Sequence, residues 1–186
     1  VLDISEFAIY SLLQELEKTH PSLAITPLIG SVQDQPYVAK VLGKFAIDTI
    51  YHAAAYKHVP LMEQNVMQCV DNNVFGTRNT AVAAVAAQVK HFILVSTDKA
   101  VNPTNFMGAS KRLAELVCQD FASRQSTTKF ATVRFGNVLG SSGSVVPLFR
   151  TQIAAGGPVT VTHADVVRYF MTIPEAAQLV IQAGSL

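Results

Sequence analysis

Residues 91–99 read HFILVSTDK, and this stretch decides the fold class. Residues 91–95 are almost continuously apolar, which is typical of a strand buried on both faces of a parallel sheet. Four polar or ionisable side chains follow at once: Ser96, Thr97, Asp98 and Lys99. Because ligands of open α/β sheets bind at the carboxyl ends of the strands, these side chains are the first candidates for a functional site.

Strands and helices alternate on both sides of this stretch. Further strands are predicted at 1–3, 23–29, 47–52 and 130–135, and an extended segment at 158–162. Helices are predicted at 34–45, 61–89, 104–123, 145–155 and 174–183, another begins after Ser5 and ends before Pro21, and a Gly/Ser-rich loop covers 136–143. This order predicts an α/β fold, a Rossmann-like doubly wound parallel sheet, as one domain over residues 1–186.

The composition excludes several classes of protein. Of the 186 residues, 49% are hydrophobic and 15% charged, and the net charge is +1. These values argue against disorder, and we expect no nucleic-acid partner. The longest apolar stretch, 79–89, is too short to span a bilayer, so no membrane span is expected in this segment. Cys69 and Cys118 lack metal-site or redox spacing, which predicts buried, reduced thiols in a cytoplasmic protein and no metal site.

The first residues resemble the end of a strand with Asp3 at its tip. In a dinucleotide-binding fold, an acidic residue at the tip of the second strand accepts hydrogen bonds from the adenosine ribose and disfavours a 2′-phosphate. Asp3 therefore predicts NAD as the cofactor; a surface aspartate is the alternative. The Gly-rich loop that normally lies about 20 residues earlier is missing, so we expect the domain to lack its first strand and phosphate loop.

A turn of small residues follows the predicted strand 47–52. Ala53, Ala54 and Ala55 would let the backbone approach a flat cofactor closely. Tight packing of a helix on the sheet is the alternative, and the two interpretations are compatible.

Two longer stretches carry a resemblance to a known family. Residues 96–111 read STDKAVNPTNFMGASK and residues 51–63 read YHAAAYKHVPLME. They resemble the bacterial UDP-N-acetylglucosamine 4,6-dehydratases of polysaccharide biosynthesis, which belong to the extended short-chain dehydrogenase/reductase superfamily. The hallmark of that superfamily is Tyr-x-x-x-Lys; here Lys111 is present and Met107 stands at the tyrosine position, as in one branch of the family. Residues 73–77, 134–138 and 167–171 extend the match.

The resemblance implies a reaction and roles for the candidate residues. NAD oxidises the sugar at carbon 4, a proton leaves carbon 5, water leaves carbon 6, and the hydride returns to carbon 6. Thr97 would bind the 4-oxygen and Lys111 the nicotinamide ribose, with Ser96 also at the cofactor. Asp98 would be the acid and Lys99 the base of the elimination, an assignment that the sequence leaves open. As neighbours in an extended segment, these two side chains are expected to point in opposite directions.

Substrate binding and partners follow from the same resemblance. The diphosphate of a UDP-sugar needs cationic or amide donors, and Lys57, Asn137 and Arg168 are the candidates, although Lys57 and Arg168 can also be solvated surface charges. Ser31 departs from the aspartate that relatives usually have near adenine. We expect a homo-oligomer that is cytoplasmic, or the cytoplasmic domain of an inner-membrane protein, because relatives in this branch often carry membrane helices.

Two other functions stay open at this point. A nucleotide-sugar 4-epimerase or reductase would share these features except for the Asp98–Lys99 pair, and would normally have a tyrosine in place of Met107. A cofactor-binding module without catalysis is the third candidate. The polar groups that remain around Met107 favour an active enzyme.

Overall fold

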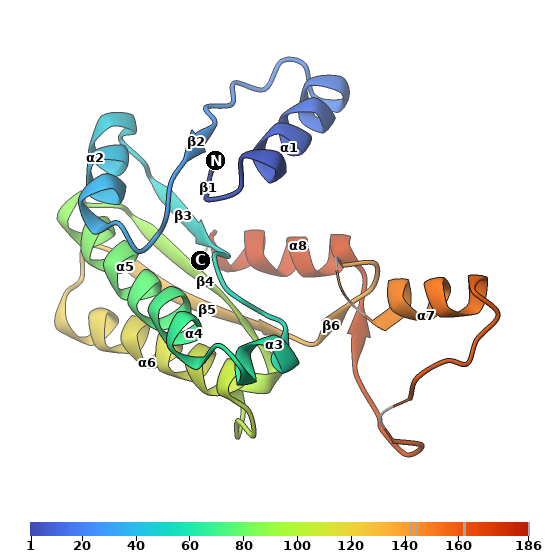
Figure 1. The fold of residues 1–186 in the computed structure, drawn as a ribbon. Helices are drawn as coiled ribbons and strands as arrows, with labels where there is room; N and C mark the ends of the chain where they lie inside the picture. Colours follow the sequence, from blue (N-terminus) through green and yellow to red (C-terminus); the bar gives the residue numbers. More distant parts are fainter. Residues whose placement is uncertain (142, 144, 162, 186) are drawn as a thin grey trace.

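The computed structural model describes residues 1–141, 143, 145–161 and 163–185. Its helices and strands (Figure 1) follow one another as β1 (Leu2–Asp3), α1 (Glu6–Thr19), β2 (Leu28–Ile29), α2 (Gln35–Phe45), β3 (Thr49–His52), α3 (Val59–Glu63), α4 (Val66–Val70), a π-helix (Asp71–Phe75), α5 (Gly76–Ala86), β4 (His91–Thr97), a 3-10 turn (Asp98–Ala100), α6 (Phe106–Arg124), β5 (Lys129–Phe135), β6 (Asn137–Val138), α7 (Val145–Ala154), β7 (Phe170–Met171) and α8 (Ile173–Ala183).

The strands confirm the predicted parallel α/β fold. β3, β4 and β5 form the central sheet in the order β3-β4-β5, with His52 opposite Leu94 and Leu94 opposite Thr132. β1 pairs with β2 and β6 with β7, and all of these pairs are parallel. In the described part of the chain, hydrogen bonds do not join the three sheets into one.

Helices cover both faces of the central sheet. α5 and α6 lie along one face and α8 crosses the other (Figure 1). The main core fills the space between β4 and the helices α5 and α6, where Phe92, Leu94, Ala84 and Ala114 have no exposed surface. The central sheet is therefore a rigid support for whatever follows its strands.

Short polar side chains fix where the helices begin. Asp34 Oδ1 accepts a hydrogen bond from the backbone N–H of Tyr37, and Asn105 Oδ1 accepts one from Gly108. Thr172 and Glu175 form a reciprocal capping box at the start of α8. Such caps satisfy amide groups that have no partner within the helix.

Several predicted elements differ from those observed. The predicted strand 23–29 shortens to Leu28–Ile29, because Pro27 lacks the N–H group that a ladder needs. The helical segments predicted to fill 61–89 are confirmed as α3, α4, the π-helix and α5. Of the predicted extended segment 158–162, the described residues 158–161 form no strand, and Thr162 lies outside the described residues. The predicted loop 136–143 contains β6, whose partner β7 was not predicted at all.

Candidate functional site

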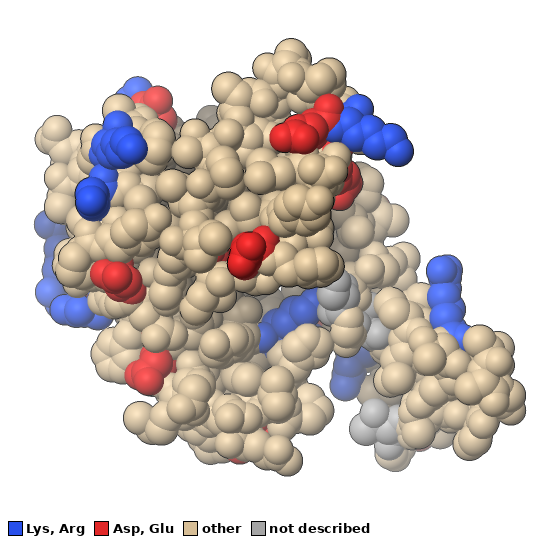
Figure 2. Space-filling view, turned by 45° about the horizontal axis from the view of Figure 1, so that its top comes forward, with Lys and Arg blue, Asp and Glu red and all other residues tan. Residues whose placement is uncertain are grey.

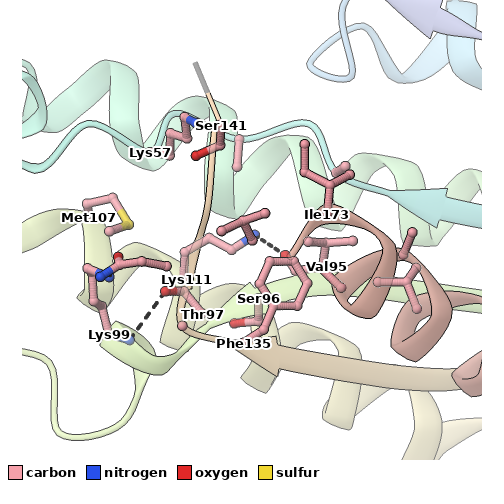
Figure 3. A pocket seen from close by; sticks show the side chains of 18 of the residues that line it. Lys57, Val95, Ser96, Thr97, Lys99, Met107, Lys111, Phe135, Ser141 and Ile173 are labelled. Atoms are coloured by element: carbon pink, nitrogen blue, oxygen red, sulfur yellow. Dashed lines mark hydrogen bonds between the residues drawn. The ribbon is translucent and has the colours of Figure 1, made fainter. Parts of the chain in front are cut away.

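A cavity of about 660 Å³ opens at the carboxyl ends of β3, β4 and β5. The segment after β3, the end of β4, the start of α6 and the loop after β5 form most of its wall, and apolar residues of α8 close one side (Figure 3). Its polar lining residues include Lys57, His58, Ser96, Thr97, Lys99, Lys111, Asn137 and Ser141. The cavity therefore lies where the sequence analysis placed the site.

The last residue of β4 and the two residues after it form a hydrogen-bonded cluster. Thr97 Oγ1 donates to Asp98 Oδ1 at 2.9 Å, and Lys99 Nζ donates to the same oxygen at 3.0 Å. Lys99 Nζ also donates to Asn137 Oδ1 at 3.3 Å. Burial alone would raise the pKa of Asp98, but the hydrogen bonds from Lys99 and Thr97 lower it below its usual value, so Asp98 is a carboxylate at neutral pH.

This cluster corrects one expectation from the sequence. Asp98 and Lys99 do not point in opposite directions, because a 3-10 turn replaces the extended segment and brings their side chains into an ion pair. The side chains of Asp98 and Lys99 are 38% and 31% exposed, so the pair is accessible to solvent rather than enclosed in the core.

Lys111 is held inside the wall of the cavity. Its side chain is 5% exposed, and Nζ donates to the carbonyl oxygen of Val95 at 2.6 Å. Burial lowers the pKa of Lys111 to about 8. One helical turn earlier, Met107 is also buried and packs against Met62 and Cys69 while lining the cavity.

The start of α6 touches the 3-10 turn directly. A Cβ atom added at Gly108 would lie 2.3 Å from the carbonyl oxygen of Lys99, so only glycine permits this approach. The first N–H group of α6, at Phe106, donates to Glu63 Oε1 at 2.9 Å. The turn that carries Asp98 and the helix that carries Lys111 are thereby held together.

Asn73 of the π-helix holds the segment after β3. Its side chain accepts a hydrogen bond from Tyr56 N at 2.8 Å and donates to Tyr56 O at 3.0 Å. It also donates to Ser110 Oγ on α6 at 2.9 Å. Thr77 Oγ1 donates to Asn73 O and accepts from His52 Nε2. Burial, and then the charge of Lys111, lower the pKa of His52 to about 3, so its imidazole is neutral.

Most of the predicted site residues meet at the cavity. The lining contains Ala53, Ala55, Lys57, Ser96, Thr97, Lys99, Met107, Lys111 and Asn137. Asp98 lies beside it through its bonds to Thr97 and Lys99. The hydroxyl of Ser96 is already engaged, because it donates to Glu115 Oε1 at 2.6 Å.

Three predicted residues do not line the cavity. Ala54 is exposed beside it. The side chain of Asp3 accepts a hydrogen bond at 2.7 Å from the backbone N–H of Ser5, the residue that caps the start of α1. Arg168 is exposed, and its guanidinium donates to the carbonyl oxygen of Val167 at 2.9 Å.

The sequence analysis missed the apolar wall. Ile173, Ala176, Ala177, Val180 and Ile181 of α8 face the polar groups across the cavity. Their helical spacing could have identified them as one face of a helix, but not the cavity that this face covers.

Comparison with known proteins gives a consistent set of relatives. The profile of a family described as "Polysaccharide biosynthesis protein" matches residues 1–186. The chain is 53% identical over 187 residues to a protein of Staphylococcus aureus named "Capsular polysaccharide biosynthesis protein CapD". The match covers 100% of this chain and 31% of that protein. The chain thus spans about a third of the length of that relative.

Two more distant relatives have named activities. A "UDP-N-acetylglucosamine 4,6-dehydratase (inverting)" of Campylobacter jejuni is 34% identical over 170 residues, covering 90% of this chain and 50% of that protein. A "UDP-glucose 4-epimerase" of Rickettsia canadensis is 35% identical over 189 residues, covering 97% of this chain and 54% of that protein. The chain is therefore related to nucleotide-sugar dehydratases and epimerases.

Solved structures agree with the fold. Pen from Bacillus thuringiensis superposes with a TM-score of 0.92 at 37% identity, over 100% of this chain and 58% of that one. DesIV, a dTDP-glucose 4,6-dehydratase from Streptomyces venezuelae solved with NAD and TYD bound, superposes with a TM-score of 0.81 at 23% identity. That match covers 92% of this chain and 59% of the DesIV chain. The second likeness shows the fold alone.

Proposed function

The chain belongs to the polysaccharide biosynthesis protein family, and on that premise we propose that residues 1–186 are part of the catalytic domain of an NAD-dependent nucleotide-sugar 4,6-dehydratase. The substrate would be a UDP-N-acetylhexosamine, UDP-N-acetylglucosamine first of all, and the product its 4-keto-6-deoxy derivative. The observation that carries the proposal is that Thr97, Lys99 and Lys111 line one cavity, with Asp98 bonded to Thr97 and Lys99 beside it and Met107 at the place of the superfamily's tyrosine.

The cavity suits a dinucleotide and a sugar. Lys111 offers a buried ammonium with hydrogen-bonding capacity beyond its one bond to Val95, and would hold the nicotinamide ribose. Ala53 and Ala55 leave room for the backbone to approach a flat ring. NAD would supply the acceptor for the hydride of carbon 4 and return that hydride to carbon 6. The proton of the 4-hydroxyl would leave to solvent by way of the Thr97 hydroxyl, and Lys99 would regain one proton from solvent after the product leaves.

The hydrogen bond between Lys99 and Asp98 supports the acid–base roles. Elimination needs a lone pair at the base for the carbon 5 proton and a proton at the acid for the leaving hydroxyl. Asp98 is a carboxylate at rest, so it must first receive a proton. Transfer of one proton from Lys99 Nζ to Asp98 Oδ1, across 3.0 Å, makes Lys99 a base and Asp98 an acid at once. Exclusion of water by the bound sugar would favour this neutral form of the pair.

The diphosphate would bind on the opposite side of the cavity from Lys111. Lys57 and Ser141 both line the cavity (Figure 3). Asn137 lines the cavity as well, and its carbonyl oxygen binds Lys99, so it would connect the diphosphate end to the acid–base pair. Arg168 would have to swing away from Val167 to reach the same ligand.

The partners and the location are part of the same proposal. We infer a homo-oligomer whose active site faces the cytoplasm, either as a soluble enzyme or as a domain of an inner-membrane protein. Among the described residues, no helix has the length and apolar character that crossing a bilayer requires. The surface in Figure 2 carries scattered acidic and basic side chains without a continuous basic face.

A 4-epimerase is the second candidate, because a relative of similar identity carries that name. Epimerisation needs a base and an acid at the 4-oxygen, and no elimination pair. The thioether of Met107 carries no exchangeable proton, and the Asp98–Lys99 pair would have no task in such a reaction. Because oxidation at carbon 4 is common to the two reactions, it is the Asp98–Lys99 pair that favours the dehydratase.

Product analysis tests the proposal. The full-length protein that contains this chain is incubated with UDP-N-acetylglucosamine, and the 4-keto product is detected by its absorbance in alkali. We expect turnover with Met107 in place. If only the Met107→Tyr variant forms product, the proposed branch is wrong, and a product that lacks the ketone identifies an epimerase.

A further inference from the structure

A carboxylate is enclosed on the helix that carries Lys111. Glu115 of α6 is 1% exposed, and it binds side chains from two strands. Ser96 Oγ of β4 donates to Oε1 at 2.6 Å, and Arg134 of β5 donates to Oε1 from Nε at 2.7 Å and to Oε2 from Nη2. Arg112 of α6 adds a bond to Oε2 at 3.0 Å. A bidentate arginine–carboxylate pair fixes orientation as well as distance.

Ser96 connects this carboxylate to the cavity. Neighbouring side chains of a strand point to opposite faces, so the side chain of Ser96 reaches α6 while those of Val95 and Thr97 point to the other face of β4; all three residues line the cavity. The carbonyl oxygen of Val95 accepts the hydrogen bond of Lys111. Two consecutive residues of β4 are thus tied to α6, one by Lys111 and the next by Glu115, immediately before Thr97.

The spacing of residues along α6 connects the hydrogen bonds of Glu115 to the position of Lys111. Met107, Lys111 and Glu115 follow one another at intervals of four residues and share one side of α6. Figure 3 shows Lys111 reaching toward Val95, with Thr97 close by. A rotation or slide of α6 against β4 and β5 would break the bonds of Glu115 and move Lys111 away from Thr97.

Glu115 is also the anion near Lys111. Burial alone would raise its pKa, but the hydrogen bonds from Arg134, Ser96 and Arg112 lower it below the usual value. Glu115 is therefore ionised at neutral pH. Its charge opposes the effect of burial, which lowers the pKa of Lys111 to about 8.

The other titratable groups that face Lys111 are thiols and an imidazole. Cys118 of α6 and Cys69 of α4 would raise the pKa of Lys111 if they were thiolates. Burial raises the pKa of Cys118 to about 12, so that thiol is neutral at physiological pH and leaves Glu115 as the charged neighbour. His52 of β3 is neutral as well, because its pKa lies at about 3.

We propose that Glu115 is a positioning residue of the site: it anchors α6 to the ends of β4 and β5 and keeps the Lys111 ammonium both in place and protonated. The proposal rests on the proposed function, in which Lys111 holds the nicotinamide ribose. An ion pair with a purely structural role would stabilise the fold equally well, yet its loss would leave the titration of Lys111 unchanged. The two roles therefore differ in a measurable quantity.

The test follows the titration of Lys111 itself. The full-length protein is prepared with isotopically labelled lysine, the signal of Lys111 is assigned with a Lys111→Met variant, and its midpoint is measured by NMR. Glu115→Gln keeps the size of the side chain and removes the charge, so the midpoint should fall by roughly one pH unit. Asp120→Asn makes the same chemical change on the exposed side of α6, where Asp120 pairs with Arg124, and should leave the midpoint unchanged.

Activity provides a second readout. In Glu115→Gln, kcat should fall by roughly fivefold at pH 8 and much less at pH 6, with KM for the nucleotide sugar little changed. If the glutamine variant does not fold, Glu115→Asp takes its place, since it keeps the charge but shortens the reach to Arg134. It should lower kcat while the Lys111 midpoint stays near that of wild type.

The outcomes separate this proposal from the proposed function. An unchanged Lys111 midpoint in a folded Glu115→Gln protein overturns the proposal, and so does a Glu115→Asp variant with wild-type kcat. The NMR titration needs no turnover. A wild-type protein that forms no 4-keto product would therefore remove the proposed function and leave the role of Glu115 measurable.

Discussion

The centre of the molecule and its two outer parts are built differently. Around β4 the side chains are enclosed: Phe92 and Leu94 have no exposed surface, and the ends of β4 and β5 are joined to α6 by hydrogen bonds to the buried carboxylate of Glu115. In the outer parts, the segment β1–α1–β2 and the segment β6–α7–β7, large apolar side chains are open, with Phe7 79% and Tyr169 83% exposed. The centre holds its geometry by itself, and the outer parts have little packing of their own.

The same division separates the candidate residues. Those at the end of the central strand β4, such as Thr97 and Lys99, meet at the cavity, and Asn137 at the start of β6 joins them. Asp3 and Arg168 lie farther out in the outer parts, where the side chain of Asp3 bonds to Ser5 N and that of Arg168 to Val167 O. Chemistry should therefore depend on the centre, and the outer parts should mainly affect ligand affinity.

The largest effects are expected from the acid–base pair. Asp98→Asn and Lys99→Met should each lower kcat by on the order of 10²–10⁴ with KM changed little, because each would remove a group that transfers a proton. Steady-state kinetics of the full-length protein measure this, with thermal melts as the control for folding. A variant that melts well below wild type yet turns over normally when folded would reduce the pair to a structural ion pair.

Truncation of an aromatic residue compares the two regions directly. Phe92→Ala should lower the free energy of unfolding by about 3–5 kcal/mol, because it opens a cavity between β4 and the helices. Phe7→Ala should change it by no more than about 0.5 kcal/mol, since the ring is mostly exposed. Denaturant unfolding of both variants checks the contrast. A large loss for Phe7→Ala would mean that α1 is covered in solution.

Acid should destabilise the centre through His52. Its pKa of about 3 in the folded protein lies below the 6.5 of an unperturbed histidine, so the unfolded chain binds more protons between these values. The contribution of neutral His52 to the free energy of unfolding is therefore complete above pH 6.5 and is lost as the pH falls toward 3. Thermal melts should show a smaller loss of Tm between pH 7 and pH 4 for His52→Gln than for wild type. Equal losses would locate the acid sensitivity elsewhere.

A smaller effect is expected where the 3-10 turn touches α6. Gly108→Ala would place a methyl group against the carbonyl of Lys99, and the resulting overpacking should cost about 1–3 kcal/mol. Because the displaced residue is part of the acid–base pair, kcat should fall as well. Gly43→Ala is the matched control, since nothing lies within 4 Å of an added Cβ there. A Gly108→Ala protein with wild-type kcat would show that the turn adapts without consequence.

The sequence was informative where a local pattern determines the structure. The apolar run 91–95 with its polar end predicted β4 and the position of the cavity, and the Lys111 spacing predicted its place on α6. Contacts between distant segments could not be derived in this way. The pairing of β6 with β7, the wall made by α8 and the bonds of Glu115 to two strands join residues with no shared local pattern. The ion pair of Asp98 and Lys99 was missed because a 3-10 turn and an extended segment are hard to distinguish over three residues.

Isotope incorporation at carbon 5 tests the central claim most directly. The full-length protein is incubated with UDP-N-acetylglucosamine in deuterated water, and the product is analysed by mass spectrometry and NMR. The account predicts a product that has lost one water and carries one solvent deuterium at carbon 5, because elimination removes that proton and protonation restores it. A product of unchanged composition without deuterium at carbon 5 would contradict the account and identify a 4-epimerase.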